Sequence, residues 1–107
     1  MRRGEVWTVS GPGYAGKPRP AVIVQADQFE ATRSITICAF TKGDLGTPLL
    51  RLPIAPSETN GLHVPSCLMI DKITTVPRSD LGRRIGHLER DTMARVEQAI
   101  MVFLGLG

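Results

Sequence analysis

A cation held between two prolines is the feature of this chain with the clearest chemical potential. Lys17-Pro18-Arg19-Pro20 runs directly into the apolar stretch Ala21-Val22-Ile23-Val24. Each proline fixes its own φ and disfavours a helical conformation in the residue before it, so Arg19 is expected on a stiff, extended backbone. A guanidinium is always charged, and its planar fork of donors suits a phosphate or a carboxylate. From these four residues alone, a solvated turn arginine is the simpler interpretation.

Two more polar residues follow apolar stretches and could join Arg19. Thr41 closes the alternating stretch 34–41, and Asp71 follows Cys67-Leu68-Met69-Ile70. Each also has an ordinary interpretation, as a strand threonine and as a turn-capping aspartate. If the three converge, Arg19 could neutralise an anion, Thr41 could donate a hydrogen bond and Asp71 could accept a proton. That combination suits phosphoryl transfer without a metal, in which positioning and charge stabilisation dominate.

Other kinds of site find less support, and we expect neither a metal nor a cofactor. His63 and His87 are far apart in sequence without a ligand-spaced partner, so we expect them at the surface or in structural hydrogen bonds. Cys38 and Cys67 lie within apolar runs, as buried thiols do. The glycine-rich loop 11–16 lacks the strand-to-helix context of a dinucleotide fingerprint.

The elements that must position these residues are mostly short strands in one domain, residues 1–107. The chain has 107 residues, 42% of them hydrophobic, and its eleven glycines and eight prolines are spread as punctuation between strands. Apolar residues at helical spacing predict one helix over 90–104, which Gly105 ends. The pattern predicts a bent antiparallel sheet or barrel capped by that helix. The predicted strands are 5–9, 20–25, 34–41, 49–54, 66–70, 72–76 and 84–88.

Net charge and hydropathy limit the partners and the cellular location that the sequence allows. The formal net charge of +3 permits a nucleic-acid partner without requiring one. The apolar runs are too short for a membrane span, no signal peptide is recognisable and the two thiols fit a reducing compartment, so we expect a cytoplasmic protein. The apolar segment 100–104 is expected to be packed core or a dimer contact.

Several motifs, in order along nearly the whole chain, resemble the MazF/PemK toxins of bacterial toxin–antitoxin systems. They are Arg3-Gly4-Glu5-Val6-Trp7, Pro18-Arg19-Pro20-Ala21-Val22-Ile23-Val24, Ala39-Phe40-Thr41, Pro65-Ser66-Cys67-Leu68-Met69-Ile70-Asp71-Lys72-Ile73-Thr74-Thr75-Val76 and Arg84-Ile85-Gly86-His87-Leu88.

The resemblance implies an SH3-like small barrel of the CcdB/PemK type that forms a homodimer. It also implies a metal-independent, sequence-specific endoribonuclease of the mRNA interferase type. Such an enzyme cleaves single-stranded RNA by 2′-hydroxyl attack, leaving a 2′,3′-cyclic phosphate and a 5′-hydroxyl. A cognate antitoxin would inhibit it and would be its only link to operator DNA.

By position, the resemblance makes Arg19 and Thr41 catalytic, and matches Asp71 to an acid that some members use as a base. Some members have a histidine before the Arg-Pro pair, where this chain has none, and an arginine where it has Met69. Lys17, Tyr14 and Ser66 are therefore the candidates for general acid and base. Tyr14, Lys17, Lys42 and Ser66 are expected to bind RNA, and the loops 11–17 and 42–46 to select bases.

Two alternatives from other functional classes stay open at this point. CcdB-type toxins share the fold and poison DNA gyrase through a C-terminal helix, without cleavage chemistry. A regulator that only binds RNA is the other. A gyrase-binding protein has no need for the Arg19 and Thr41 pair, and an apolar end at 100–104 that is packed away would also argue against it.

Overall fold

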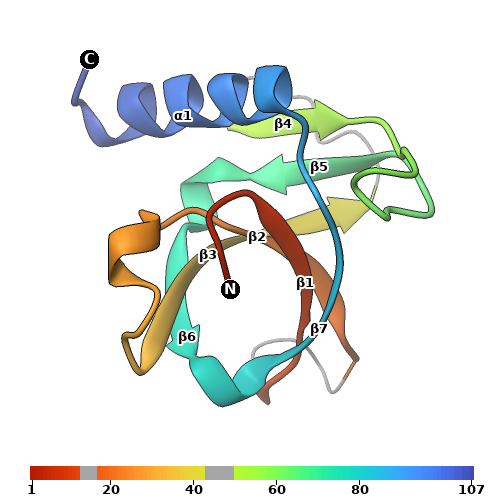
Figure 1. The fold of residues 1–107 in the computed structure, drawn as a ribbon. Coiled ribbons are helices and arrows are strands. Elements are labelled where there is room, and N and C mark those ends of the chain that lie inside the picture. Colours follow the sequence, from red (N-terminus) through yellow and green to blue (C-terminus); the bar gives the residue numbers. More distant parts are fainter. Residues whose placement is uncertain (13–16, 43–49) are drawn as a thin grey trace.

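The computed structural model describes residues 1–12, 17–42 and 50–107, and antiparallel strands dominate this part of the chain (Figure 1). The sheet has the order β4-β5-β3-β2-β1-β7, and β6 pairs with β3. This confirms the mainly β fold with a C-terminal helix. The strands are β1 (Glu5–Val9), β2 (Arg19–Ile23), β3 (Ser34–Lys42), β4 (Arg51–Ile54), β5 (Ser66–Met69), β6 (Thr74–Pro77) and β7 (Leu81–His87). Short 3-10 turns are η2 (Asp27–Phe29), η3 (Ile70–Lys72) and η4 (Arg78–Asp80), and the helix is α1 (Arg90–Leu104).

The long strand β3 organises the sheet, because it pairs with β2, β5 and β6. Its side chains alternate between two buried apolar clusters, as the sequence predicted. Ile35, Ile37 and Ala39 belong to one cluster, and Cys38 and Phe40 to the other. Because the sheet curls strongly, one cluster fills the inside of the curve and the other lies under α1 (Figure 1).

The helix α1 has the predicted bounds, and it packs on β4 and η3. Val96 and Ala99 are buried against the sheet, which is the apolar face that the helical spacing predicted. Gly105 ends the helix in the left-handed conformation, with φ of 73°. The amide of Leu106 donates to the carbonyl of Met101 over 2.8 Å, which satisfies an end carbonyl of the helix.

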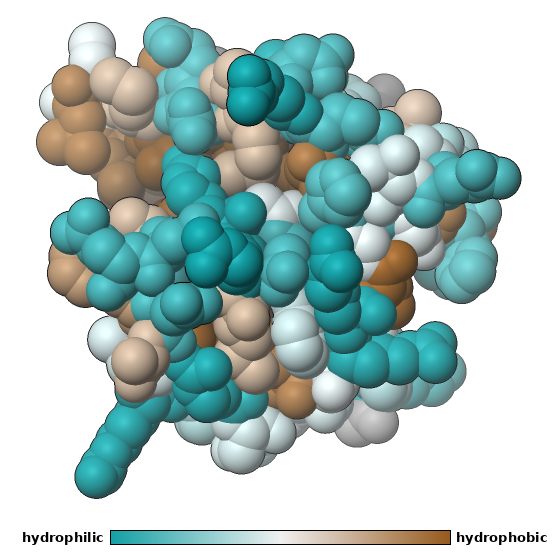
Figure 2. Space-filling model, in the orientation of Figure 1, coloured by the Kyte–Doolittle hydropathy of each residue, from teal (hydrophilic) through white to brown (hydrophobic). Residues whose placement is uncertain are grey.

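The last turn of α1 differs from the prediction of packed core. Met101, Val102, Phe103 and Leu104 are between 41% and 49% exposed. Figure 2 shows apolar side chains at the upper left, where this part of α1 lies in Figure 1. Of the segment 100–104, Ile100 packs against the core, but the last four residues do not, because the helix extends past the sheet (Figure 1). The dimer contact stays a prediction. Within the described ranges, no helix is long and apolar enough to cross a membrane.

Candidate active site

A cavity of about 580 Å³ lies where β2 begins and β3 ends, and both Arg19 and Thr41 line it. Lys17, Lys42 and Ser66, three of the four residues predicted to bind RNA, line it as well. The fourth, Tyr14, lies outside the described residues, as do residues 13–16 and 43–46 of the predicted base-selecting loops 11–17 and 42–46. Thr8, His63 and Arg83 complete the polar lining among the described residues.

Strand register explains why residues so far apart in sequence meet here. Ala21 of β2 faces Ala39 of β3, and the same register continued toward the start of β2 sets Arg19 opposite Thr41. On the other side of β3, Lys42 faces Ser66 of β5. Directly opposed residues in antiparallel strands have Cβ atoms roughly 4.5–5.5 Å apart, so these residues are close neighbours. The site is therefore a row across adjacent strands.

The electrostatic character of the cavity is positive. Lys17, Arg19, Lys42 and Arg83 line it, and no acidic side chain occurs among its described lining residues. None of these four cations forms an ion pair with an acidic residue of the described ranges. A cavity lined by one sign of charge concentrates ligands of the opposite sign. The arrangement favours a polyanion such as a nucleic-acid backbone.

Arg83 is a cavity residue that the sequence did not indicate. Strand β7 begins at Leu81, three residues before the predicted start, and so includes Gly82 and Arg83. The amide of Arg83 donates to Oγ1 of Thr8 over 3.0 Å, which fixes this part of β7 beside β1. The two consecutive arginines interrupted the apolar pattern, and that is why the strand was predicted too short.

His63 was expected at the surface, and its side chain is exposed, but it also lines the cavity. The loop that carries it is anchored by Asn60, which is only 1% exposed. Oδ1 of Asn60 accepts from the amides of Ser57 and Leu62, each over 3.0 Å. Gly61 has φ of +71°, and a Cβ there would lie 2.1 Å from the carbonyl oxygen of Ile85. The loop thus lies directly against the backbone of β7.

Ser66 has a local role in the same region. Its side chain is 6% exposed, and its hydroxyl donates to the carbonyl of Val64 over 2.9 Å. The hydroxyl hydrogen is therefore used to hold the turn that leads into β5. Its oxygen keeps acceptor capacity toward the cavity.

Asp71 is not brought to the cavity. It lies in η3, past the end of β5 that is remote from Ser66, and its carboxylate forms an ion pair with Arg51 of β4. Their side chains are 27% and 15% exposed, so the pair is largely enclosed by the fold. The expected convergence of three residues is therefore limited to Arg19 and Thr41. Strand β5 runs away from the cavity after Ser66, so Asp71, which follows this strand, lies outside the cavity.

The cysteines have the buried positions that the sequence predicted. Burial raises the pKa of the Cys38 thiol to about 12, and the nearby charge of Asp71 acts in the same direction. Because only the thiolate is a strong nucleophile, Cys38 is an inert core side chain at neutral pH.

Comparison with known proteins adds family information to this geometry. The family model described as PemK-like, MazF-like toxin of type II toxin–antitoxin system matches residues 2–104. The probable endoribonuclease MazF of Mycolicibacterium smegmatis is 50% identical over 107 residues, which cover 99% of this chain and 98% of that protein.

Solved structures agree with the fold. The Mycobacterium tuberculosis toxin MazF-mt6 superimposes with a TM-score of 0.82 at 25% identity, covering 96% of this chain and 98% of the toxin. An endoribonuclease in complex with its cognate antitoxin, from a mycobacterial species, gives a TM-score of 0.83 at 24% identity. That match covers 100% of this chain and 97% of the other.

Proposed function

This chain belongs to the family of PemK-like, MazF-like toxins of type II toxin–antitoxin systems, and we propose that the cavity beside Arg19 and Thr41 is where it cleaves RNA. It is an endoribonuclease of the MazF type, since half of its residues are identical to those of a probable MazF endoribonuclease over the whole chain. The observation that carries the proposal is the meeting of Arg19 and Thr41 with Lys17, Lys42 and Arg83 around one cavity.

In the proposed reaction, a 2′-hydroxyl of single-stranded RNA attacks the adjacent phosphorus. The new P–O2′ bond forms while the P–O5′ bond breaks, giving a 2′,3′-cyclic phosphate and a 5′-hydroxyl. The 2′-hydroxyl loses a proton and the 5′-oxygen gains one, so the products balance without a metal. Arg19 offsets the charge that develops on the phosphoryl oxygens, and Thr41 donates a hydrogen bond to a non-bridging oxygen.

The other cavity residues have a binding role in this proposal. Lys17, Lys42 and Arg83 contact neighbouring phosphates, and Ser66 accepts a hydrogen bond from the substrate. Tyr14 and the segments 11–17 and 42–46 provide the contacts that select bases, because single strands expose their base edges to loops and aromatic rings. Asp71 stays outside the reaction, because its carboxylate is paired with Arg51 away from the cavity.

We also propose the partners that this family implies. The toxin acts in the cytoplasm as a homodimer, and the exposed apolar end of α1 supports a contact with a second copy. A cognate antitoxin inhibits it by covering the positive cavity, and operator DNA is bound only through that antitoxin. Single-stranded RNA is the substrate.

The test is cleavage of a long RNA in the presence of EDTA, with the ends mapped by primer extension. We expect discrete cuts by the wild type, and losses of about 10²- to 10³-fold for Arg19→Ala and Thr41→Ala, because each removes a donor aimed at developing charge. Direct phosphorylation of the new ends by a 5′-hydroxyl kinase checks the product chemistry. Circular dichroism and thermal melts verify that both variants fold. Intact RNA together with inhibition of DNA gyrase would overturn the proposal.

A further inference from the structure

The proposed cleavage needs a group that protonates the leaving oxygen, and the residues of the cavity restrict the choice. Its described lining contains lysines, arginines, hydroxyl residues, apolar side chains and one histidine, His63. Ordinary pKa values are roughly 10.4 for lysine and above 12 for arginine, whereas imidazole changes charge near neutral pH. Within the described lining, His63 alone carries a side chain of the type that can give up a proton and regain it in each turnover.

The position of His63 suits a reacting group. It directly follows Gly61 and Leu62, which are held by the buried Asn60 and by the backbone of β7. Leu62 is only 7% exposed and belongs to an apolar core cluster, so the backbone beneath His63 is fixed from two sides. The imidazole itself is exposed and accepts or donates no hydrogen bond with a described residue. A fixed backbone with an open side chain allows contact with a substrate at low cost in entropy.

We infer that His63 is the general acid of the reaction, an assignment that rests on the proposed function. As the P–O5′ bond breaks, the imidazolium donates its proton to the 5′-oxygen, which leaves as a hydroxyl, and the imidazole becomes neutral. The 2′-hydroxyl passes its proton to a solvent water, and after product release the solvent returns that proton to the imidazole. An alkoxide is a strongly basic leaving group, so this is the step at which a proton donor contributes most.

The cleavage rate should change with pH in one direction. The other charged side chains of the cavity, among the described residues, are Lys17, Arg19, Lys42 and Arg83, and all of them are cationic. Because the imidazolium is the active form, cleavage by the wild type should fall toward alkaline pH. A His63→Ala variant should not show that fall.

The decisive experiment compares two RNA substrates cut at the same mapped site. One has the natural phosphodiester and the other a sulfur atom in place of the 5′-bridging oxygen, since a thiolate leaves without protonation. On natural RNA we expect His63→Ala to lower kcat about 10²-fold with little change in KM, the size of a general-acid effect. On the sulfur-bridged RNA it should cleave at nearly the wild-type rate.

The chain offers a matched control in its second histidine. His87 is exposed on β7, where Nδ1 lies 3.4 Å from Nη2 of Arg84, and it does not line the cavity. His87→Ala should match the wild type on both substrates. A His63→Ala variant that cleaves natural RNA normally would overturn the inference, and an equal loss on both substrates would overturn the acid role. Failure of the wild type to cleave RNA would instead overturn the proposed function.

Discussion

The two ends of β5 bear opposite kinds of polar site. At Ser66 the strand borders a cavity in which Lys17, Arg19 and Lys42 have no described acidic partner. Beyond Met69 the chain enters η3, where Asp71 is paired with Arg51. Charges left without a counter-ion in a concave site are available to a ligand, whereas the members of an enclosed ion pair already satisfy each other's charge. On the proposed function, Arg19 acts on the substrate, whereas Arg51 is paired within the structure.

The largest expected effect tests the cavity at the Ser66 end of β5. Arg19→Lys keeps the positive charge but loses the planar fork that bridges two phosphoryl oxygens. We expect kcat/KM to fall about 10- to 100-fold, compared with about 10²- to 10³-fold for Arg19→Ala. Both variants should keep the wild-type melting temperature, because Arg19 is exposed. Single-turnover cleavage of a mapped RNA site measures this, and full activity in Arg19→Lys would reduce its role to that of a simple cation.

The next largest effect tests the Arg51–Asp71 ion pair beyond the other end of β5. Asp71→Asn leaves Arg51 charged and largely enclosed without its partner, so we expect a loss of about 1.5–3 kcal/mol in the free energy of unfolding. Cleavage by the folded variant should stay close to the wild-type rate. Urea denaturation and cleavage at a temperature well below the transition measure the two quantities.

A double variant sharpens this second prediction. Arg51→Met combined with Asp71→Leu removes both charges and should recover part of the lost stability, because neither group is then left unpaired. A variant Asp71→Asn with normal stability and a cleavage defect as large as that of Arg19→Ala would return Asp71 to the reaction.

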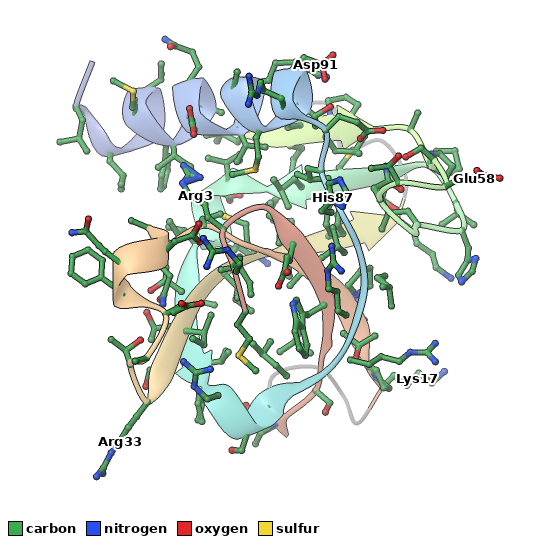
Figure 3. The ribbon with its side chains drawn as sticks, in the orientation of Figure 1. Arg3, Lys17, Arg33, Glu58, His87 and Asp91 are labelled. Carbon is green, nitrogen blue, oxygen red and sulfur yellow. The ribbon has the colours of Figure 1, made fainter. Side chains whose placement is uncertain are left out.

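The smallest expected effect concerns RNA binding in the cavity at the Ser66 end of β5. Lys17→Ala should weaken RNA binding modestly and reduce the slope of log K against log salt by about 0.7, the value for one phosphate contact with a single strand. Arg33→Ala is the control, since Arg33 is an exposed cation on the opposite side of the molecule from Lys17 (Figure 3). Fluorescence anisotropy over a salt series measures both slopes. Equal slopes for the two variants would mean that Lys17 acts only through net charge.

The sequence was most informative where the pattern is local. The strand 5–9 and the helix 90–104 have the bounds that hydrophobic periodicity predicted, because each buries one face on its neighbours. Alternation in 34–41 predicted which of its residues share a buried face. The polar strand ends indicated two residues that line the cavity, Arg19 and Thr41.

What the sequence could not indicate depends on contacts between distant segments. Arg83 enters the cavity through pairing of β7 with β1, and His63 through docking of its loop on β7. Asp71 lies outside the cavity because η3 turns toward β4, where Asp71 pairs with Arg51. Each of these positions is decided by the tertiary structure, for which local propensity has no signal.

The contact between the 55–65 loop and β7 has a genetic consequence. Gly61 lies against the carbonyl of Ile85, and a Cβ on Gly86 would lie 2.4 Å from the carbonyl of Thr59. Every missense change in a glycine codon introduces a side chain, so at these two codons each such change separates the loop from the strand. Since this gene encodes a toxin of the PemK-like, MazF-like family, cells that escape its action should therefore collect lesions at Gly61 and Gly86, far from Arg19 and Thr41 in sequence.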